Sequence, residues 1–258
     1  MLPNYEHAFK NSNGKWIFVP TDESREQGYA ILKEIHDYWE APKYFYHLQT
    51  GGHVAALKAH QNKKFYVRAD IKRFFSSISR NRIVSSLKKT GLFYKRSKEI
   101  ADTSTVMSKE TPHKKVLPFG FVQSPILASI ALDHSAVGKF LRSDIVGVTR
   151  TVYADDFLYS SDDKEILQKT YLDLQKSISQ SGFAINNGKS HAPQEQTCIF
   201  NVDITKNSLK ISDSRYQEFT DEMFGMNRLR SEAIAHYVRT INLEQSNKLL
   251  SLFKNGSG

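Results

Sequence analysis

The sequence predicts an α+β fold in which an antiparallel sheet packs on helices. Two runs rich in β-branched and aromatic residues, 64–69 and 145–161, predict strands, and an acidic pair inside the second run predicts a hairpin. Apolar residues recur at helical spacing between and after these runs, at 24–40, at 162–181 and in the C-terminal part. With 258 residues the chain can bury a substantial core, as one unit or as two closely packed subdomains.

The composition is that of an ordinary globular protein, with 40% hydrophobic and 24% charged residues. The 36 Lys and Arg residues exceed the 27 Asp and Glu residues, which gives a net charge of +9. Such an excess favours a polyanionic partner, because phosphate groups are attracted to basic surfaces. Charge alone is not specific, since many basic proteins bind no nucleic acid.

The single cysteine, Cys198, excludes an intramolecular disulfide, and no Cys and His cluster has the spacing of zinc ligands. A reducing cytoplasm is therefore the simplest compartment. The first residues lack a basic region followed by an apolar one, and no apolar run approaches membrane-spanning length. We expect neither secretion nor a membrane anchor.

The segments before the first long strand are predicted as follows. Residues 15–20 predict a short strand or an extended lead-in, and the helix at 24–40 has Ser24 as its expected N-cap. A short helical stretch at 54–60 precedes the strand at 64–69.

Three acidic residues stand out on the predicted strands. Asp70 ends the run at 64–69, where an aspartate also often caps the next turn. Asp155 and Asp156 lie at the tip of the predicted hairpin. Adjacent carboxylates between apolar strands repel each other and lose hydration, a cost that is explained when they face a divalent cation. The alternative for the pair is an ordinary solvated turn.

A capped helix is predicted between these acids. After a helix that begins at Ser79 and a polar loop at 104–115, Pro118 and Gly120 mark a turn. Ser124 is expected as the N-cap, with Pro125 at the first helical position.

The C-terminal third predicts a helix, a hairpin and more helices. Gly182 ends the helix at 162–181, and Phe183–Ser190 reads as a short strand and turn. Residues 197–204 and 208–212 predict a hairpin, and the remaining apolar pattern predicts two or three helices.

Taken in order, four of these segments resemble motifs A, B, C and D of reverse transcriptases. Motif A is the strand that ends at Asp70, and motif C is the Tyr-x-Asp-Asp sequence at 153–156. Motif B is the segment at 120–125, and motif D is the Gly-Phe-x-Ile-Asn-x-x-Lys arrangement at 182–189. Many relatives carry Gly-x-Pro-Gln-Gly before the Ser-Pro pair of motif B, whereas the shorter form here is similar to that of retron-like bacterial enzymes.

The resemblance implies a right-hand polymerase with fingers, an antiparallel palm sheet and a short helical thumb. Residues 1–69 are expected to form N-terminal and fingers segments with the palm entry strand. Residues 70–212 are expected to form the palm, with the motif B segment and a primer-grip hairpin. Residues 213–254 then make the thumb, and 255–258 a linker or tail. The compact length is typical of a retron or defence-associated bacterial enzyme.

The same resemblance implies two-metal catalysis with Mg²⁺, for which Mn²⁺ is a substitute. Asp70 and Asp155 are expected to bridge the ions, while Asp156 completes the site or holds its geometry. The backbone carbonyl of Ile71 is an implied further ligand.

Three other residues receive implied roles in nucleotide handling. Phe75 is expected beneath the incoming sugar, where its ring excludes a ribose 2′-hydroxyl, with a core phenylalanine as the alternative. Gln123 is expected to line the nucleotide pocket. Lys189 is expected to protonate the leaving pyrophosphate, and a surface turn lysine is its alternative.

The implied partners are an RNA template, a DNA or RNA primer and deoxynucleoside triphosphates, with a dedicated noncoding RNA or a partner protein as further candidates. Basic residues of the fingers and thumb are candidates for phosphate contacts or, equally, for a solvated surface. They are Lys58, Lys63, Lys64, Arg68, Arg215, Arg228, Arg230 and Arg239.

Two other functions stay open. The same palm can make RNA, or DNA that is untemplated or protein-primed. A binding module without catalysis is the other, although a binder has no need of three converging acids.

Overall fold

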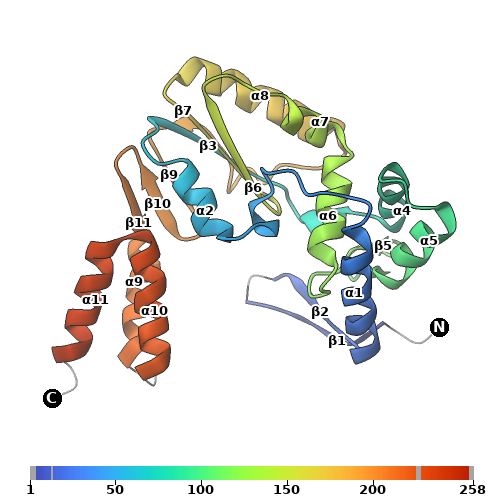
Figure 1. The fold of residues 1–258 in the computed structure, drawn as a ribbon, viewed down its shortest axis with the longest axis horizontal. Helices are drawn as coiled ribbons and strands as arrows, with labels where there is room; N and C mark the ends of the chain where they lie inside the picture. The colour runs from blue at the N-terminus through green and yellow to red at the C-terminus, as the bar shows by residue number, and fades with distance from the viewer. Residues whose placement is uncertain (1–3, 13, 225–227, 256–258) are drawn as a thin grey trace.

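The computed structural model describes residues 4–12, 14–224 and 228–255, and its centre is a four-stranded antiparallel sheet (Figure 1). The strand order is β6-β7-β3-β8. The strands are β3 (Phe65–Asp70), β6 (Val148–Tyr153), β7 (Asp156–Ser161) and β8 (His191–Gln194). The predicted hairpin is β6–β7, and the register of β3 on β7 places Asp70 opposite Asp156.

Both faces of the two central strands, β3 and β7, are buried, so buried residues follow one another along these strands instead of alternating with exposed ones. Val67 and Phe157 face a core that includes α6 (Ser124–Asp133), α7 (Ala136–Arg142) and α8 (Lys164–Gln180). Tyr66 and Leu158 face a second core on the other side, because neighbouring strand residues point to opposite faces. This second core includes residues of α2 (Gly52–Ala59) and of the C-terminal part.

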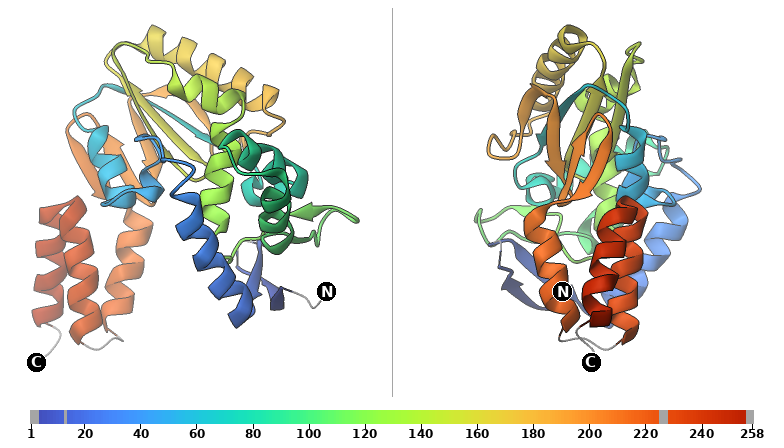
Figure 2. Two further views of the ribbon diagram at one scale, coloured as in Figure 1. Left: turned by 45° about the vertical axis from the view of Figure 1, so that its right-hand side comes forward. Right: turned by 90° about the vertical axis from the view of Figure 1, so that its left-hand side faces the viewer.

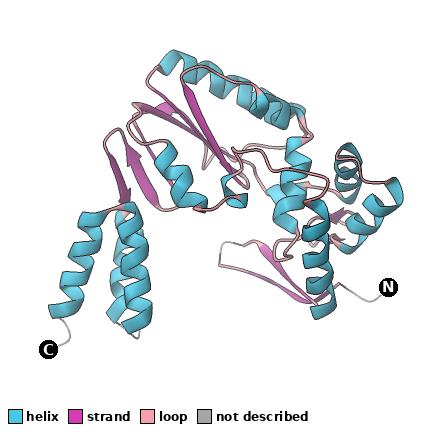
Figure 3. Ribbon diagram, viewed as in Figure 1, coloured by secondary structure: helices cyan, strands magenta, loops and turns pink. Residues whose placement is uncertain are grey.

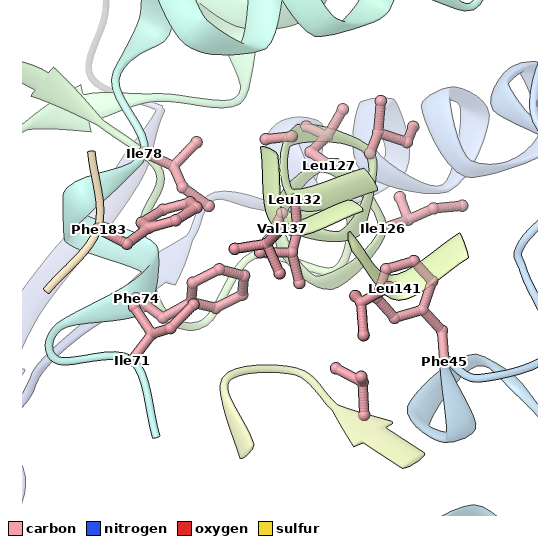
Figure 4. Close-up of a cluster of buried hydrophobic side chains, with 14 of the residues drawn as sticks. Phe45, Ile71, Phe74, Ile78, Ile126, Leu127, Leu132, Val137, Leu141 and Phe183 are labelled. Carbon is pink, nitrogen blue, oxygen red and sulfur yellow. The ribbon is translucent and has the colours of Figure 1, made fainter. Parts of the chain in front are cut away.

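The segment after Asp70 is held by the first core. Ile71 pairs with Ile185, and Phe74, Ile78 and Phe183 pack together near α6 (Figure 4). This packing fixes the chain immediately downstream of the acid.

The N-terminal part is a hairpin followed by a helix. The elements are β1 (Tyr5–Lys10), β2 (Trp16–Pro20) and α1 (Asp22–Ile35). The strand at 15–20 is therefore confirmed, but the predicted helix bounds are wrong. The N-cap is Thr21, whose hydroxyl accepts from the backbone N–H of Ser24 at 3.2 Å, so Ser24 lies inside the first turn. The helix ends at Ile35 rather than near residue 40.

Small helices and a second hairpin follow β3 (Figure 3). They are α3 (Phe74–Ser77), α4 (Arg80–Lys89), α5 (Tyr94–Thr103), β4 (Val106–Met107) and β5 (Lys115–Val116). Ser79 caps α4 as predicted, whereas the ends of the predicted loop at 104–115 pair as β4 and β5. Gln123, not Ser124, occupies the N-cap position of α6, because Ser124 already has helical geometry.

The C-terminal part is a three-stranded sheet with three helices. The elements are β9 (Gln196–Ile199), β10 (Val202–Thr205), β11 (Ser208–Ile211), α9 (Asp213–Phe224), α10 (Arg228–Ile241) and α11 (Leu243–Asn255). The β10–β11 hairpin is confirmed, but the strand expected at 197–204 breaks into two. Phe200 and Asn201 have φ values of 56° and 58°, and this left-handed turn reverses the chain.

The helices α9–α11 and the N-terminal elements project in the same direction from opposite ends of the central sheet (Figures 1 and 2). The side chain of Arg228 and most of the expected tail at 255–258 lie outside the described residues. In the described part of the chain, no helix has the length and apolar character needed to cross a membrane.

Candidate active site

The tip of the β6–β7 hairpin is the feature around which the site is built. Ala154 and Asp155 form the turn, and Ala154 has a φ of 56°, which an L-residue rarely adopts. The backbone N–H of Ile71 donates to the carbonyl of Asp155 at 3.0 Å. This bond joins the motif A strand to the turn, so Asp70, Asp155 and Asp156 come together at one end of the sheet.

The carboxylates of this site are desolvated and repel one another. Burial, followed by the charges of Asp156 and Asp70, raises the pKa of Asp155 from an ordinary 3.8 to about 6. Burial also raises the pKa of Asp156, although Arg68 opposes the shift. Asp70 is only 3% exposed. Such a cluster of partly buried negative charge is stabilised by a cation.

Two of the acids contact basic side chains. Asp156 accepts hydrogen bonds from Arg68, at 2.8 Å to Nη2 and 3.2 Å to Nε. Asp70 Oδ2 lies 3.7 Å from Lys189 Nζ. Within the described ranges, no group of three or more Asp, Glu, His or Cys side chains is arranged so that it could hold a metal ion. Asp70 and Asp155 supply the oxygen donors that suit Mg²⁺ or Mn²⁺, while Asp156 is turned toward Arg68.

A cavity of about 520 Å³ adjoins Asp155. Lys72, Phe75 and Lys189 line this cavity, together with residues of the β1–β2 hairpin. Its basic residues are Lys15, Lys72, Arg73, Lys109 and Lys189, and Glu110 pairs with Arg73 at 3.2 Å. The positive charge of these basic residues suits the binding of a polyphosphate.

Gly120 allows the β1–β2 hairpin to approach the motif B turn closely. Its φ is 121°, and a Cβ there would lie 2.2 Å from the carbonyl oxygen of Phe18. Phe18 N–H also donates to the carbonyl of Phe119 at 2.9 Å. The motif B turn and β2 are thus in backbone contact.

The structure separates the two phenylalanines that follow Asp70. Both residues line the cavity, but Phe74 is buried in the core, whereas Phe75 is half-buried at the edge of that core. The ring of Phe75 also meets the edge of Phe119, with ring centroids 5.5 Å apart.

Gln123 is not among the described residues that line the cavity. It is 1% exposed, and its Nε2 donates to the hydroxyl of Ser104 at 3.2 Å. It packs against Gly28 of α1, where a Cβ would lie 2.5 Å from its Oε1.

Some site residues were not assigned from the sequence. Arg68 was a candidate for nucleic-acid contact, but it is turned inward to Asp156 and to the carbonyl of Cys198 at 2.8 Å. Lys15 and Lys109 reach the cavity from separate segments, and no local pattern marks them. A lysine on a strand or loop is usually solvated, so only the packing of β2 and the loop after β4 reveals them.

The family of the chain follows from residues 9–201, which match the family described as "Reverse transcriptase (RNA-dependent DNA polymerase)". The chain belongs to this family, as motifs A to D predicted, and the α+β fold prediction is confirmed. Divalent metal ions are the general cofactor of this family.

Retron enzymes of bacteria are among its relatives. The chain is 24% identical over 217 residues to the retron Mx65 reverse transcriptase of Myxococcus xanthus, which covers 74% of this chain and 49% of that protein. It is 31% identical over 120 residues to the retron Ec73 reverse transcriptase of Escherichia coli, covering 43% of this chain and 36% of that protein. The chain thus spans about half or less of the length of these relatives.

Solved structures share the fold. Telomerase from Candida albicans in complex with a fragment of telomeric RNA aligns with a TM-score of 0.58 at 13% identity, over 90% of this chain and 46% of that chain. The foamy viral protease-reverse transcriptase in complex with double-stranded DNA aligns with a TM-score of 0.54 at 17% identity, over 97% and 39%.

Proposed function

We propose that this chain is an RNA-directed DNA polymerase that extends a primer 3′-hydroxyl with deoxynucleotides. The observation that carries the proposal is the meeting of Asp70, Asp155 and Asp156 beside a basic cavity. In the reaction the primer 3′-hydroxyl releases its proton to water and its oxygen forms a bond to the α-phosphorus, while the bond from the α-phosphorus to the bridging oxygen of the β-phosphate breaks and pyrophosphate leaves.

Asp70 and Asp155 are the proposed metal ligands, with Mg²⁺ as the ion and Mn²⁺ as a substitute. When bound, the ions lower the pKa of the primer hydroxyl and neutralise charge on the phosphoryl group. Asp156, held by Arg68, fixes the end of β7 and so the position of Asp155. The carbonyl of Ile71 is a further proposed ligand, since its N–H already bonds the turn.

The cavity is the proposed nucleotide site. Lys15, Lys72 and Arg73 supply positive charge for a triphosphate. Phe75 forms the wall on which the sugar is expected to rest, so that a 2′-hydroxyl clashes with the ring. Lys189 is half-exposed and close to Asp70, and it is the proposed proton donor to pyrophosphate. Gln123 is buried away from this cavity, so no contact with the nucleotide is proposed for it.

RNA as template and DNA or RNA as primer are the proposed partners. The net charge of +9 and the nucleic acids bound by the two structural neighbours support them. Sequence similarity to retron enzymes favours a role in a bacterial defence system, with a dedicated noncoding RNA or a partner protein.

The test is extension of a DNA primer on an RNA template of known sequence, with Mg²⁺ and the four deoxynucleotides, followed by sequencing of the product. We expect the complement of the template from the native chain and none from Asp155→Asn. Untemplated tails would instead indicate untemplated DNA synthesis, and ribonucleotide products would indicate RNA synthesis on the same palm. Absence of any incorporation by the folded chain would refute the proposal.

A further inference from the structure

The segment before α2 lies against the catalytic hairpin. Tyr44 accepts a hydrogen bond from the N–H of Val152 at 2.8 Å, and Phe45 pairs with Val152 in a parallel bridge. The hydroxyl of Tyr44 donates to the buried carboxylate of Asp133 at 3.0 Å. A single 3₁₀ turn, η1 (Tyr46–Leu48), follows and places His47 beside the hairpin tip.

The hydrogen bonds around His47 determine which of its ring nitrogens carries the proton. The one hydroxyl proton of Ser129 is donated to the carbonyl of Pro125 at 2.9 Å. Ser129 Oγ must therefore accept from His47 Nε2–H, 2.7 Å away. Nδ1 is then left with a lone pair, and it accepts the backbone N–H of Ala154 at 3.0 Å.

This chain of bonds runs from helix α6, which carries the Ser-Pro pair of motif B, to the turn of motif C. Burial lowers the pKa of His47 to about 4, although the backbone of Val152 opposes the shift, so the ring is neutral at ordinary pH and Nδ1 remains an acceptor. The bond ends on Ala154, the residue with the left-handed φ of 56° immediately before Asp155. Strained residues of this kind persist only when their surroundings hold them.

We propose that His47 is a positioning residue for catalysis, which holds the Ala154 amide and thereby sets the place of the Asp155 carboxylate. This inference rests on the proposed polymerase function. The hairpin tip has a second anchor, the bond from Ile71 N–H to Asp155 C=O. Loss of His47 therefore leaves the hairpin paired but its tip held on one side only.

A packing role for the ring is the competing explanation. His47 contacts Phe45 and Tyr153, each with ring centroids 5.6 Å apart. His47→Phe keeps an aromatic ring but removes both nitrogens. His47→Asn places an acceptor where Nδ1 lies and cannot reach Ser129, whereas His47→Gln reaches toward Ser129 without the Nδ1 acceptor.

The experiment compares these three variants and Ser129→Ala in single-nucleotide extension. Loss of a residue that orients a metal ligand lowers activity by about 10- to 100-fold, so we expect such a loss of kcat in His47→Phe and His47→Gln with little change in KM for the deoxynucleotide. His47→Asn should recover most of kcat. The kcat of Ser129→Ala should lie between that of the native chain and that of His47→Phe. In this variant the His47 ring can adopt the tautomer whose Nδ1–H opposes the Ala154 N–H. The control is His36→Asn, an exposed histidine at the end of α1.

A second readout is independent of turnover. Mn²⁺ affinity, measured by electron paramagnetic resonance of the free ion, should weaken several-fold in His47→Phe and be restored in His47→Asn. Equal kcat and Mn²⁺ affinity in native chain and His47→Phe, or no recovery in His47→Asn, would overturn the inference. Failure of the native chain to incorporate nucleotides would refute the polymerase proposal, and the Mn²⁺ series would still decide the role of His47. If His47→Phe does not fold, Ser129→Ala and His47→Asn carry the test.

Discussion

Asp155→Asn should stabilise the metal-free protein while it abolishes synthesis. In the native chain the Asp155 carboxylate is placed beside Asp156 and Asp70 in a partly buried turn, and its pKa rises from 3.8 to about 6. A rise of about two units corresponds to about 3 kcal/mol against the charged form, since each unit is about 1.4 kcal/mol. Residual solvent contact reduces this, so we expect a gain of about 1–3 kcal/mol at pH 7.5.

The pH dependence has a definite sign. The folded-state pKa of Asp155 is raised, so the neutral acid is favoured by folding, and this contribution is fully present below pH 3.8 and lost as pH rises through about 6. The advantage of Asp155→Asn should therefore be near zero at pH 4 and complete above pH 6.

The assay is thermal unfolding of both proteins with a chelator, across this pH range. For a chain of this size each kcal/mol corresponds to about 2–4 °C in Tm. Adding Mg²⁺ should raise the Tm of the native chain and not of the variant. Asp144→Asn is the control, because Asp144 is 94% exposed. A variant that melts at or below the native Tm in chelator at pH 7.5 would refute the electrostatic account of the site.

Three further outcomes are expected. Phe75→Val should admit ribonucleotides while remaining folded, because Phe75 lines the cavity; an unchanged ratio of deoxy to ribo incorporation would exclude it as the sugar gate. Primer-template binding should weaken steeply with salt, as expected for phosphate contacts with released counterions, and a flat titration would point to another ligand. Burial lowers the pKa of His60 to about 3 and that of His47 to about 4, so protonation of the unfolded chain should reduce stability as pH falls below about 6.5. In the Asp155→Asn background, which removes one of the two opposing carboxylates and leaves Asp156, the free energy of unfolding measured with urea should fall by up to about 1.5 kcal/mol per histidine between pH 6.5 and 5. An unchanged free energy of unfolding over this range would contradict buried, neutral imidazole rings.

The sequence alone determined the features that depend on neighbouring residues. β-branched and aromatic content located β3 and the β6–β7 hairpin, and the order of motifs A to D identified the family. The β10–β11 hairpin and the cap at Ser79 were found for the same reason, since short-range backbone geometry dictates which residues occur at turns and helix caps. Even here the N-cap of α1 was misplaced by three residues, because Thr21 competes with Ser24 for the cap.

Tertiary structure alone decided which distant side chains meet. Arg68 turned inward to Asp156 because β3 pairs with β7 in one register, which no local pattern around Arg68 expresses. Gln123 lies in the interior because Gly28 of α1 leaves space for its side chain. His47 reached Ala154 only through the bridge of its segment to β6. Such contacts depend on strand register and helix packing over long sequence separations, whereas periodicity and capping signals report only on the chain within a few residues.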